Sequence, residues 1–243
     1  MPAVIETTDL SKTYKGVGGG VKAVSDLSLS VEQGEIFGLV GPNGSGKTTT
    51  LKLLLGLLYP TSGQARVFGE DPMVKTEVRQ RVGFLPEGPY FYDHLDAVEV
   101  LSFYAKLFRI PKDQTRERID KLLEQVGMTD RKRVRLGQCS KGMVQRIGLA
   151  QALINEPDLV LLDEPTSGLD PLGARDMRNY IISLRAQGRT VFLCSHLLSE
   201  VERMCDRVAI LHQGRLLQVL RIKELTGPLE DHFVQLVEEA EKH

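Results

Sequence analysis

Short apolar segments alternate with helically spaced apolar positions along this chain of 243 residues. Residues 36–40, Ile-Phe-Gly-Leu-Val, are almost wholly apolar, which predicts a strand buried on both faces. Residues 4–6 and 27–31 alternate apolar and polar side chains, as strands with one exposed face do. Further strand-like runs lie at 159–162, 190–194 and 208–211. Strands that alternate with helices predict an α/β fold with a largely parallel sheet.

Helical spacing marks the segments between these strands. A helix soon after the strand at 36–40 is predicted by Leu51, Leu54, Leu55 and Leu58. Asp96 to Glu99 has the D-x-x-E form of a helix start, and an apolar stripe that ends at Gly127 consists of Ile119, Leu122, Leu123 and Val126. We therefore expect a single domain with a helical insertion. Its core is expected at about 1–88 and 156–225, its helical subdomain at about 89–155 and a short tail at about 226–243.

Composition excludes several classes of protein. With 42% hydrophobic and 26% charged residues, the chain can form a buried core, and wholesale disorder is not expected. The formal net charge is −1 and no long Lys/Arg run occurs, so no nucleic-acid partner is expected. Cys139, Cys194 and Cys205 lack metal-ligand spacing, which favours a reducing compartment. The longest apolar patch, residues 51–59, contains a lysine and a glycine, so the chain is expected neither to enter nor to span a membrane by itself.

The clearest chemical motif is GPNGSGKT at residues 41–48, which fits G-x-x-x-x-G-K-[ST] between a buried strand and a helix. Its glycines let backbone N–H groups turn toward phosphate oxygens, and the helix N-terminus adds favourable partial charge. Lys47 is expected to contact the β- and γ-phosphates, and the Thr48 hydroxyl to bind Mg²⁺. The expected nucleotide-binding residues are Gly41, Pro42, Asn43, Gly44, Ser45, Gly46, Lys47, Thr48 and Thr49. No Lys-Ser/Thr pair or helix start follows the glycine run at 16–20, which therefore predicts a flexible hairpin connection.

Two adjacent acids, Asp163 and Glu164, end a second apolar strand. An acid at the carboxyl end of a central strand lies beside the crevice where open α/β sheets bind ligands. Asp163 suits the Mg²⁺ shell, directly or through water, and Glu164 suits the base that polarises an attacking water. Together with the phosphate loop, these acids predict hydrolysis of a nucleoside triphosphate.

Residues 139–146, Cys-Ser-Lys-Gly-Met-Val-Gln-Arg, resemble the signature of the ATP-binding cassette (ABC) family, although alone they also fit a plain helix cap. Ser140, Gly142, Gln145 and Arg146 match the family pattern, whereas Cys139, Lys141 and Met143 depart from it. The Ser-Lys-Gly-Met form is similar to that of subunits that serve separately encoded exporter permeases. The resemblance covers almost the whole chain. It implies an ATPase with ATP and Mg²⁺ as cofactors, and a P-loop NTPase (RecA-like) core with a mostly parallel sheet, an N-terminal antiparallel β subdomain and a helical insertion.

The resemblance also implies roles for further residues. Tyr14 lies where the family stacks an aromatic ring on adenine, although a core or surface tyrosine fits the sequence alone. His196 follows an apolar strand, where the family has a histidine that contacts the γ-phosphate, and Asp170 ends the family's interface turn. Glu87 stands where the family usually has a glutamine near Mg²⁺ and the attacking water, so it is either a metal ligand or a surface acid.

Family subunits close in head-to-tail pairs on two ATP molecules. Ser140, Lys141, Gly142 and Met143 are therefore expected to contact ATP held by Lys47 of a second copy of this chain or of a similar subunit. Tyr90, Phe91 and Tyr92 are expected to touch a cytoplasmic helix of a transmembrane permease subunit, unless they form the insertion's own core. These expectations place the chain at the cytoplasmic face of a membrane, held there through the permease, with export as the direction of transport.

Two other functions stay open from the sequence. A soluble ABC-type ATPase acting on nucleic acid or ribosomes would normally carry long heptad arms or a second cassette, and neither is found here. Another phosphate-loop enzyme, such as a kinase or a GTPase, would leave residues 140–146 unexplained. The motifs do not specify the cargo, the permease, or whether the pair is a homodimer or a heterodimer.

Overall fold

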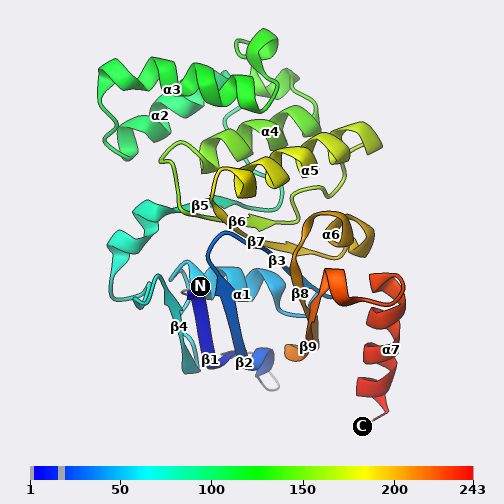
Figure 1. Cartoon of the computed structure of the whole chain (residues 1–243). Coiled ribbons are helices and arrows are strands. Elements are labelled where there is room, and N and C mark those ends of the chain that lie inside the picture. Colours follow the sequence, from blue (N-terminus) through cyan, green and yellow to red (C-terminus); the bar gives the residue numbers. More distant parts are fainter. Residues whose placement is uncertain (1–2, 16–19, 243) are drawn as a thin grey trace. The chain divides into compact units, whose positions relative to one another are not determined.

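The computed structural model describes residues 3–15 and 20–242 (Figure 1). Most of the connection predicted at 16–20 lies outside the described residues. The chain divides into two compact units, residues 1–79 with 190–243 and residues 80–189, called here the first and the second unit. The bounds expected for core, helical subdomain and tail stay predictions. No helix in the described part of the chain combines the length and the apolar character needed to cross a bilayer.

The N-terminal part of the first unit is an antiparallel sheet, as predicted. Strand β1 (Ala3–Tyr14) pairs with β2 (Val21–Glu32) on one side and with β4 (Ser62–Val67) on the other. Leucines and valine point inward along residues 27–31 while the serines between them are exposed, which confirms the alternation. The alternation expected at 4–6 is wrong, because Val4 and Ile5 are both buried where a register shift interrupts the pairing of β1 with β2.

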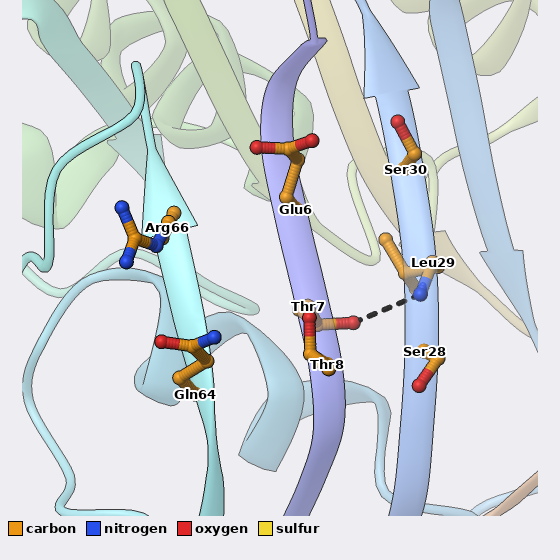
Figure 2. Close-up of a pocket in the computed structure, with 8 residues that line it drawn as sticks. All are labelled: Glu6, Thr7, Thr8, Ser28, Leu29, Ser30, Gln64 and Arg66. Atoms are coloured by element: carbon orange, nitrogen blue, oxygen red, sulfur yellow. Dashed lines mark hydrogen bonds between the residues drawn. The ribbon is translucent and has the colours of Figure 1, made fainter.

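The opposite face of this sheet is polar. Figure 2 shows a hollow there, lined along β1, β2 and β4 by short hydroxyl side chains and by Glu6, Gln64 and Arg66. The buried Thr7 hydroxyl accepts a hydrogen bond from the Leu29 N–H at 3.0 Å and so ties β1 to β2. One apolar face and one polar face are typical of an antiparallel sheet that covers a core on one side.

The remaining strands of the first unit form the part of the sheet that positions chemistry. Strand β3 (Ile36–Val40) lies between β7 (Thr190–Ser195) and β8 (Arg207–His212) and is parallel to both. Strand β9 (Arg215–Arg221) is antiparallel to β8 and joins β2 by a parallel bridge. Every residue of β3 is buried, which confirms the prediction of a strand covered on both faces.

Helices α1 (Lys47–Leu54), α6 (Leu198–Met204) and α7 (Leu229–Glu241) complete the first unit, with short 3₁₀ helices at Thr76–Arg81, which crosses its boundary, and Ile222–Glu224. The expectation that α1 extends to Leu58 is wrong. The helix stops because Leu55 caps it and Gly56 adopts a left-handed φ of +61°, the usual C-terminal stop. The tail helix α7 is anchored by the buried Leu229, whose N–H donates to the Glu202 carboxylate at 3.4 Å.

The second unit is mainly helical, as predicted for most of it. Strands β5 (Val82–Leu85) and β6 (Leu159–Asp163) are parallel neighbours. The helices are α2 (Ala97–Leu107), α3 (Lys112–Gln125), α4 (Lys141–Ala152) and α5 (Pro171–Ala186), with 3₁₀ turns at Thr129–Arg131 and Leu136–Gln138. The predicted start of α2 is confirmed as a capping box, because Asp96 and Glu99 each accept a hydrogen bond from the other's backbone N–H.

Candidate functional site

The glycine-rich loop between β3 and α1 is shaped by close packing at its two ends. A Cβ atom at Gly41 would collide with the Leu211 carbonyl oxygen, and one at Gly46, where φ is +107°, would collide with the Ala23 carbonyl oxygen. Gly44 also has a positive φ, +82°, but open space lies in front of it. A side chain is therefore excluded at positions 41 and 46. The open space at Gly44 leaves room for a ligand against the backbone.

The polar groups of this loop fit a phosphate. Lys47 is buried, and its ammonium donates to the carbonyl oxygens of Gly41 at 2.8 Å and Pro42 at 3.2 Å. The buried Ser45 hydroxyl has no hydrogen-bond partner among the described residues. A buried hydroxyl, an ammonium and the N-terminus of α1 are donors of the kind that phosphate oxygens accept, with Thr48 exposed on the first turn. The residues present therefore fit the predicted triphosphate.

Tyr14, at the end of β1, lies beside the first turn of α1. Its hydroxyl is 3.5 Å from the Thr49 hydroxyl, and the Lys12 ammonium is 5.5 Å from the centre of its ring. The side chain is 39% exposed, so Tyr14 is no core residue. Stacking on adenine stays a prediction for this ring.

His196 follows the strand that neighbours β3. In the parallel pair β3 and β7, Val40 is opposite Ser195, so Gly41 and His196 leave the same edge of the sheet from adjacent strands. His196 is exposed, and the Ser195 hydroxyl before it accepts a hydrogen bond from the Leu197 N–H at 3.0 Å. This register explains why a histidine far away in sequence reaches the edge where the phosphate loop begins.

The second unit gathers its acids at one strand edge in the same way. Leu85 of β5 is opposite Leu162 of β6, so Glu87 and the pair Asp163 and Glu164 follow at the same edge. Asp163 and Glu164 are buried, at 2% and 5% exposure, whereas Glu87 is exposed. Across the described residues, no three His, Cys, Asp or Glu side chains come together as a metal cluster. Mg²⁺ beside a nucleotide commonly needs only one or two carboxylates, because phosphates and waters supply its other ligands.

The signature segment forms the start of α4. Ser140 is the N-cap, and its hydroxyl accepts a hydrogen bond from the Met143 N–H at 3.3 Å. On the first turn, Lys141 is exposed and Gly142 is partly exposed. Cys139, just before the cap, is partly exposed and its thiol donates weakly to the Arg135 carbonyl at 3.5 Å, whereas Cys194 and Cys205 are buried.

The expected interface turn lies against this helix start. Asp170 is the N-cap of α5, with its carboxylate 2.7 Å from the Gly173 N–H. Gly168, at φ +67°, is so close to the Lys141 ammonium that a Cβ atom there would collide with it. The structure therefore brings Lys141 together with Gly168 of the turn.

Two contacts between α4 and the chain after Glu164 were not predicted. The Gln145 side-chain amide donates to the Pro165 carbonyl at 3.2 Å, and Arg146 pairs with Asp176 at 2.8 Å. The sequence singled out Gln145 and Arg146 as matching a family pattern but gave them no role. Local periodicity carries no signal for either partner, because each lies 20 or more residues further along the chain.

Aromatic side chains line a groove in the second unit. This aromatic groove, about 390 Å³ in volume, is formed by Tyr90, Phe91, Tyr92, Leu95, Glu99, Val100, Phe103 and Tyr104. Tyr90 is 86% exposed and Tyr92 is 68% exposed, so neither belongs to the core of the insertion. Arg135 pairs with Glu99 at 3.0 Å, so one lining carboxylate is already paired with a cation.

Comparison with known proteins places these motifs in one family. The ABC transporter family model matches residues 24–167. An uncharacterized ABC transporter ATP-binding protein of Nostoc sp. is 50% identical over 239 residues, which cover 96% of this chain and 71% of that protein. The bacitracin transport ATP-binding protein BcrA of Bacillus licheniformis is 45% identical, covering 93% of this chain and 72% of that protein. A fluoroquinolones export ATP-binding protein of Mycobacterium tuberculosis is 43% identical, covering 80% and 64%.

The fold leads to the same family. A solved structure of the ATP-binding subunit of an ABC transporter matches with a TM-score of 0.85 at 29% identity, covering 96% of this chain and 99% of that one. The predicted P-loop α/β fold is thereby confirmed. The chain therefore belongs to the ABC transporter family, in which it is an ATP-binding and ATP-hydrolysing subunit.

Proposed function

We propose that two such subunits close head to tail on two ATP molecules and that hydrolysis reopens them, which drives a transmembrane permease toward export. The observation that carries the proposal is that the chain has two helix starts of anion-binding type. The phosphate loop precedes α1, and the capped start of α4 presents the exposed Lys141 and the partly exposed Gly142. One chain's phosphate loop already supplies its own nucleotide with donors, so the second start suits the nucleotide of a partner.

In the proposed reaction, Lys47, Ser45 and the loop amides hold the phosphates of ATP. Glu164 accepts the proton of the water that attacks the γ-phosphorus, and the bond to the β-phosphate oxygen breaks to leave ADP. His196 donates one N–H to the γ-phosphate, and Tyr14 packs against adenine. Glu164 is buried, which suits this role because few water molecules other than the attacking one reach its carboxylate.

Mg²⁺ would be held by Thr48, Asp163 and Glu87 together with the phosphates, and it would neutralise charge that develops on them. Hydroxyl and carboxylate oxygens are ligands that suit this hard cation. Glu87 adds a negative charge where the family has a neutral glutamine, so it strengthens the attraction for the cation and the repulsion of the phosphates together.

The aromatic groove is the proposed docking place of a short cytoplasmic helix of the permease. The exposed Tyr90 and Tyr92 and the partly exposed Phe91 supply anchors of the kind that receive an amphipathic helix, while Phe103 and Tyr104 come from α2. Docking there would hold the chain at the cytoplasmic face of the membrane. Export is favoured by the Ser-Lys-Gly-Met form of the signature and by the relative named for fluoroquinolone export.

Glu164→Gln tests the proposal, because this variant should bind ATP, lose hydrolysis and accumulate as a closed dimer. The dimer is measured by light scattering after gel filtration with ATP and Mg²⁺, and the double variant that also carries Lys47→Ala should stay monomeric. Affinity purification of Glu164→Gln from detergent-solubilised native membranes should then recover a polytopic protein. A soluble dimer that brings ribosomes or nucleic acid and no membrane protein would favour the soluble ABC-type ATPase instead.

A further inference from the structure

Gln145 links the signature helix to the segment that carries the proposed base. It lies on the second turn of α4 and is 2% exposed. Its side-chain N–H donates to the backbone carbonyl of Pro165 at 3.2 Å, and Pro165 directly follows Glu164. A buried amide that reaches a buried carbonyl has displaced water from both groups, so the contact matters more than one on the surface.

The backbone at Glu164 needs such support. Glu164 adopts a left-handed φ of +49°, which is uncommon for a residue with a side chain and persists only where its surroundings hold it. Within the loop, the Ser167 N–H donates to the Glu164 carbonyl at 3.1 Å. The Gln145 hydrogen bond supports the loop from a different element, the helix α4, which begins more than twenty residues before the loop.

Neighbouring contacts make α4 and this loop one packed body inside the second unit. A Cβ atom added at Gly142 would lie 3.7 Å from the Leu169 side chain, an ordinary van der Waals distance. Arg146 pairs with Asp176 of α5 at 2.8 Å. The helix cap at Ser140 is five positions before Gln145, which is about 7.5 Å along an α-helix. One helix therefore connects the signature start directly to the Pro165 carbonyl.

We propose that Gln145 is a positioning residue for ATP hydrolysis: it fixes the Glu164–Pro165 peptide so that the Glu164 carboxylate faces the attacking water. The inference rests on the proposed role of Glu164 as the base. A neutral amide is suited to this task because a lysine or an arginine would pair with the carboxylate and weaken it as a base. Engagement of the signature by a partner's nucleotide would thereby be linked to the placement of the base in the same chain.

Gln145→Met is the decisive variant, because methionine has similar length and helix propensity but donates no hydrogen bond. The kcat for ATP should fall about 10- to 100-fold, the loss expected from a misplaced catalytic group, with the KM for ATP changed by less than about twofold. The matched control is Gln151→Met, a half-buried glutamine in the last turn of the same helix, which should keep the kcat of the natural protein.

A double variant separates positioning from general structural damage. In the Glu164→Gln background, Gln145→Met should leave the residual single-turnover rate unchanged, because the group through which Gln145 acts is already lost. The inference is overturned if Gln145→Met keeps the natural kcat, or if it lowers the rate equally in both backgrounds. Should Gln145→Met not fold, Gln145→Asn gives the same test, since its amide is one methylene too short. Natural turnover in Glu164→Gln alone would overturn the proposed function and this inference together, whereas an inactive Glu164→Gln with a fully active Gln145→Met overturns the inference alone.

Discussion

Replacing Tyr90 with Ala removes the most exposed aromatic side chain of the aromatic groove. A tyrosine presents about 150–250 Å² of surface, so with 86% of it exposed about 130–210 Å² is available for a partner to cover. At about 25 cal/mol per Å², full burial is worth at most about 3–5 kcal/mol. Ordering of the side chain and desolvation of its hydroxyl reduce this to about 1–3 kcal/mol. The dissociation constant of the permease complex should therefore rise about 5- to 150-fold.

The same exposure predicts a small effect on folding. The free energy of unfolding of Tyr90→Ala should stay within about 0.5 kcal/mol of the natural value, because little of the side chain is buried in the protein itself. Nucleotide affinity should not change, since none of the residues expected to bind the nucleotide lines the aromatic groove. Tyr59, 73% exposed and in the first unit, is the matched control, because Tyr59→Ala removes a similar exposed ring outside the groove.

The assay compares these variants in the Glu164→Gln background. Each tagged protein is purified with ATP from the same detergent-solubilised native membranes, and the recovered polytopic protein is quantified by mass spectrometry. Tyr90→Ala should recover several-fold less of it than Tyr59→Ala, and Tyr92→Ala should behave like Tyr90→Ala. Equal recovery with all three variants would refute the assignment of the groove as the permease docking place.

Three further predictions concern charge and capping. Glu87→Gln removes a negative charge that we propose lies beside the phosphates, so the Mg²⁺ concentration that half-saturates ATPase activity should change. An unchanged Mg²⁺ titration curve would make Glu87 a plain surface acid. Ser140→Ala removes the N-cap of α4 and should lower the free energy of unfolding by about 1 kcal/mol in urea titrations; a loss near zero would contradict the capping role. Burial raises the pKa of Glu35 above 4.5, more than the Glu32 N–H and Arg207 lower it, so the folded state binds the proton better than the unfolded state. The free energy of unfolding of the natural protein, relative to that of Glu35→Gln, should therefore fall as the pH rises from 4.5 to the raised pKa. Urea titrations at several pH values measure both free energies, and a constant difference between them would contradict this prediction.

Much of the fold was predictable from local sequence. Buried strand β3 and the alternating part of β2 follow from side-chain pattern alone, and the capping box at Asp96 follows from residue types at fixed spacing. The end of α1 was missed, although Gly56 carries the signal: apolar spacing continues to Leu58, but the left-handed glycine stops the helix first. Side-chain spacing was outweighed there by backbone conformation.

The candidate site was predictable motif by motif but not contact by contact. The phosphate loop, the paired acids and the signature are each contiguous, so residue types and spacing reveal them. The contacts of Gln145 with Pro165 and of Lys141 with Gly168 join segments 20 or more residues apart. Such contacts depend on which helices and strands pack against each other, and the periodicity of a single sequence does not reveal this.

The placement of the cysteines gives the protein a built-in attachment point for a probe. Cys205 is deeply buried, and burial together with the charges of Asp206 and Glu35 holds its pKa well above the ordinary value, so its thiol resists alkylation. Cys139 is partly exposed and directly precedes the Ser140 cap, although burial raises its pKa too. A maleimide should therefore react preferentially with the Cys139 thiol at mildly alkaline pH. A fluorophore there would sit beside the signature helix and would follow the proposed nucleotide-driven pairing of subunits in real time, in the natural sequence and without an engineered thiol.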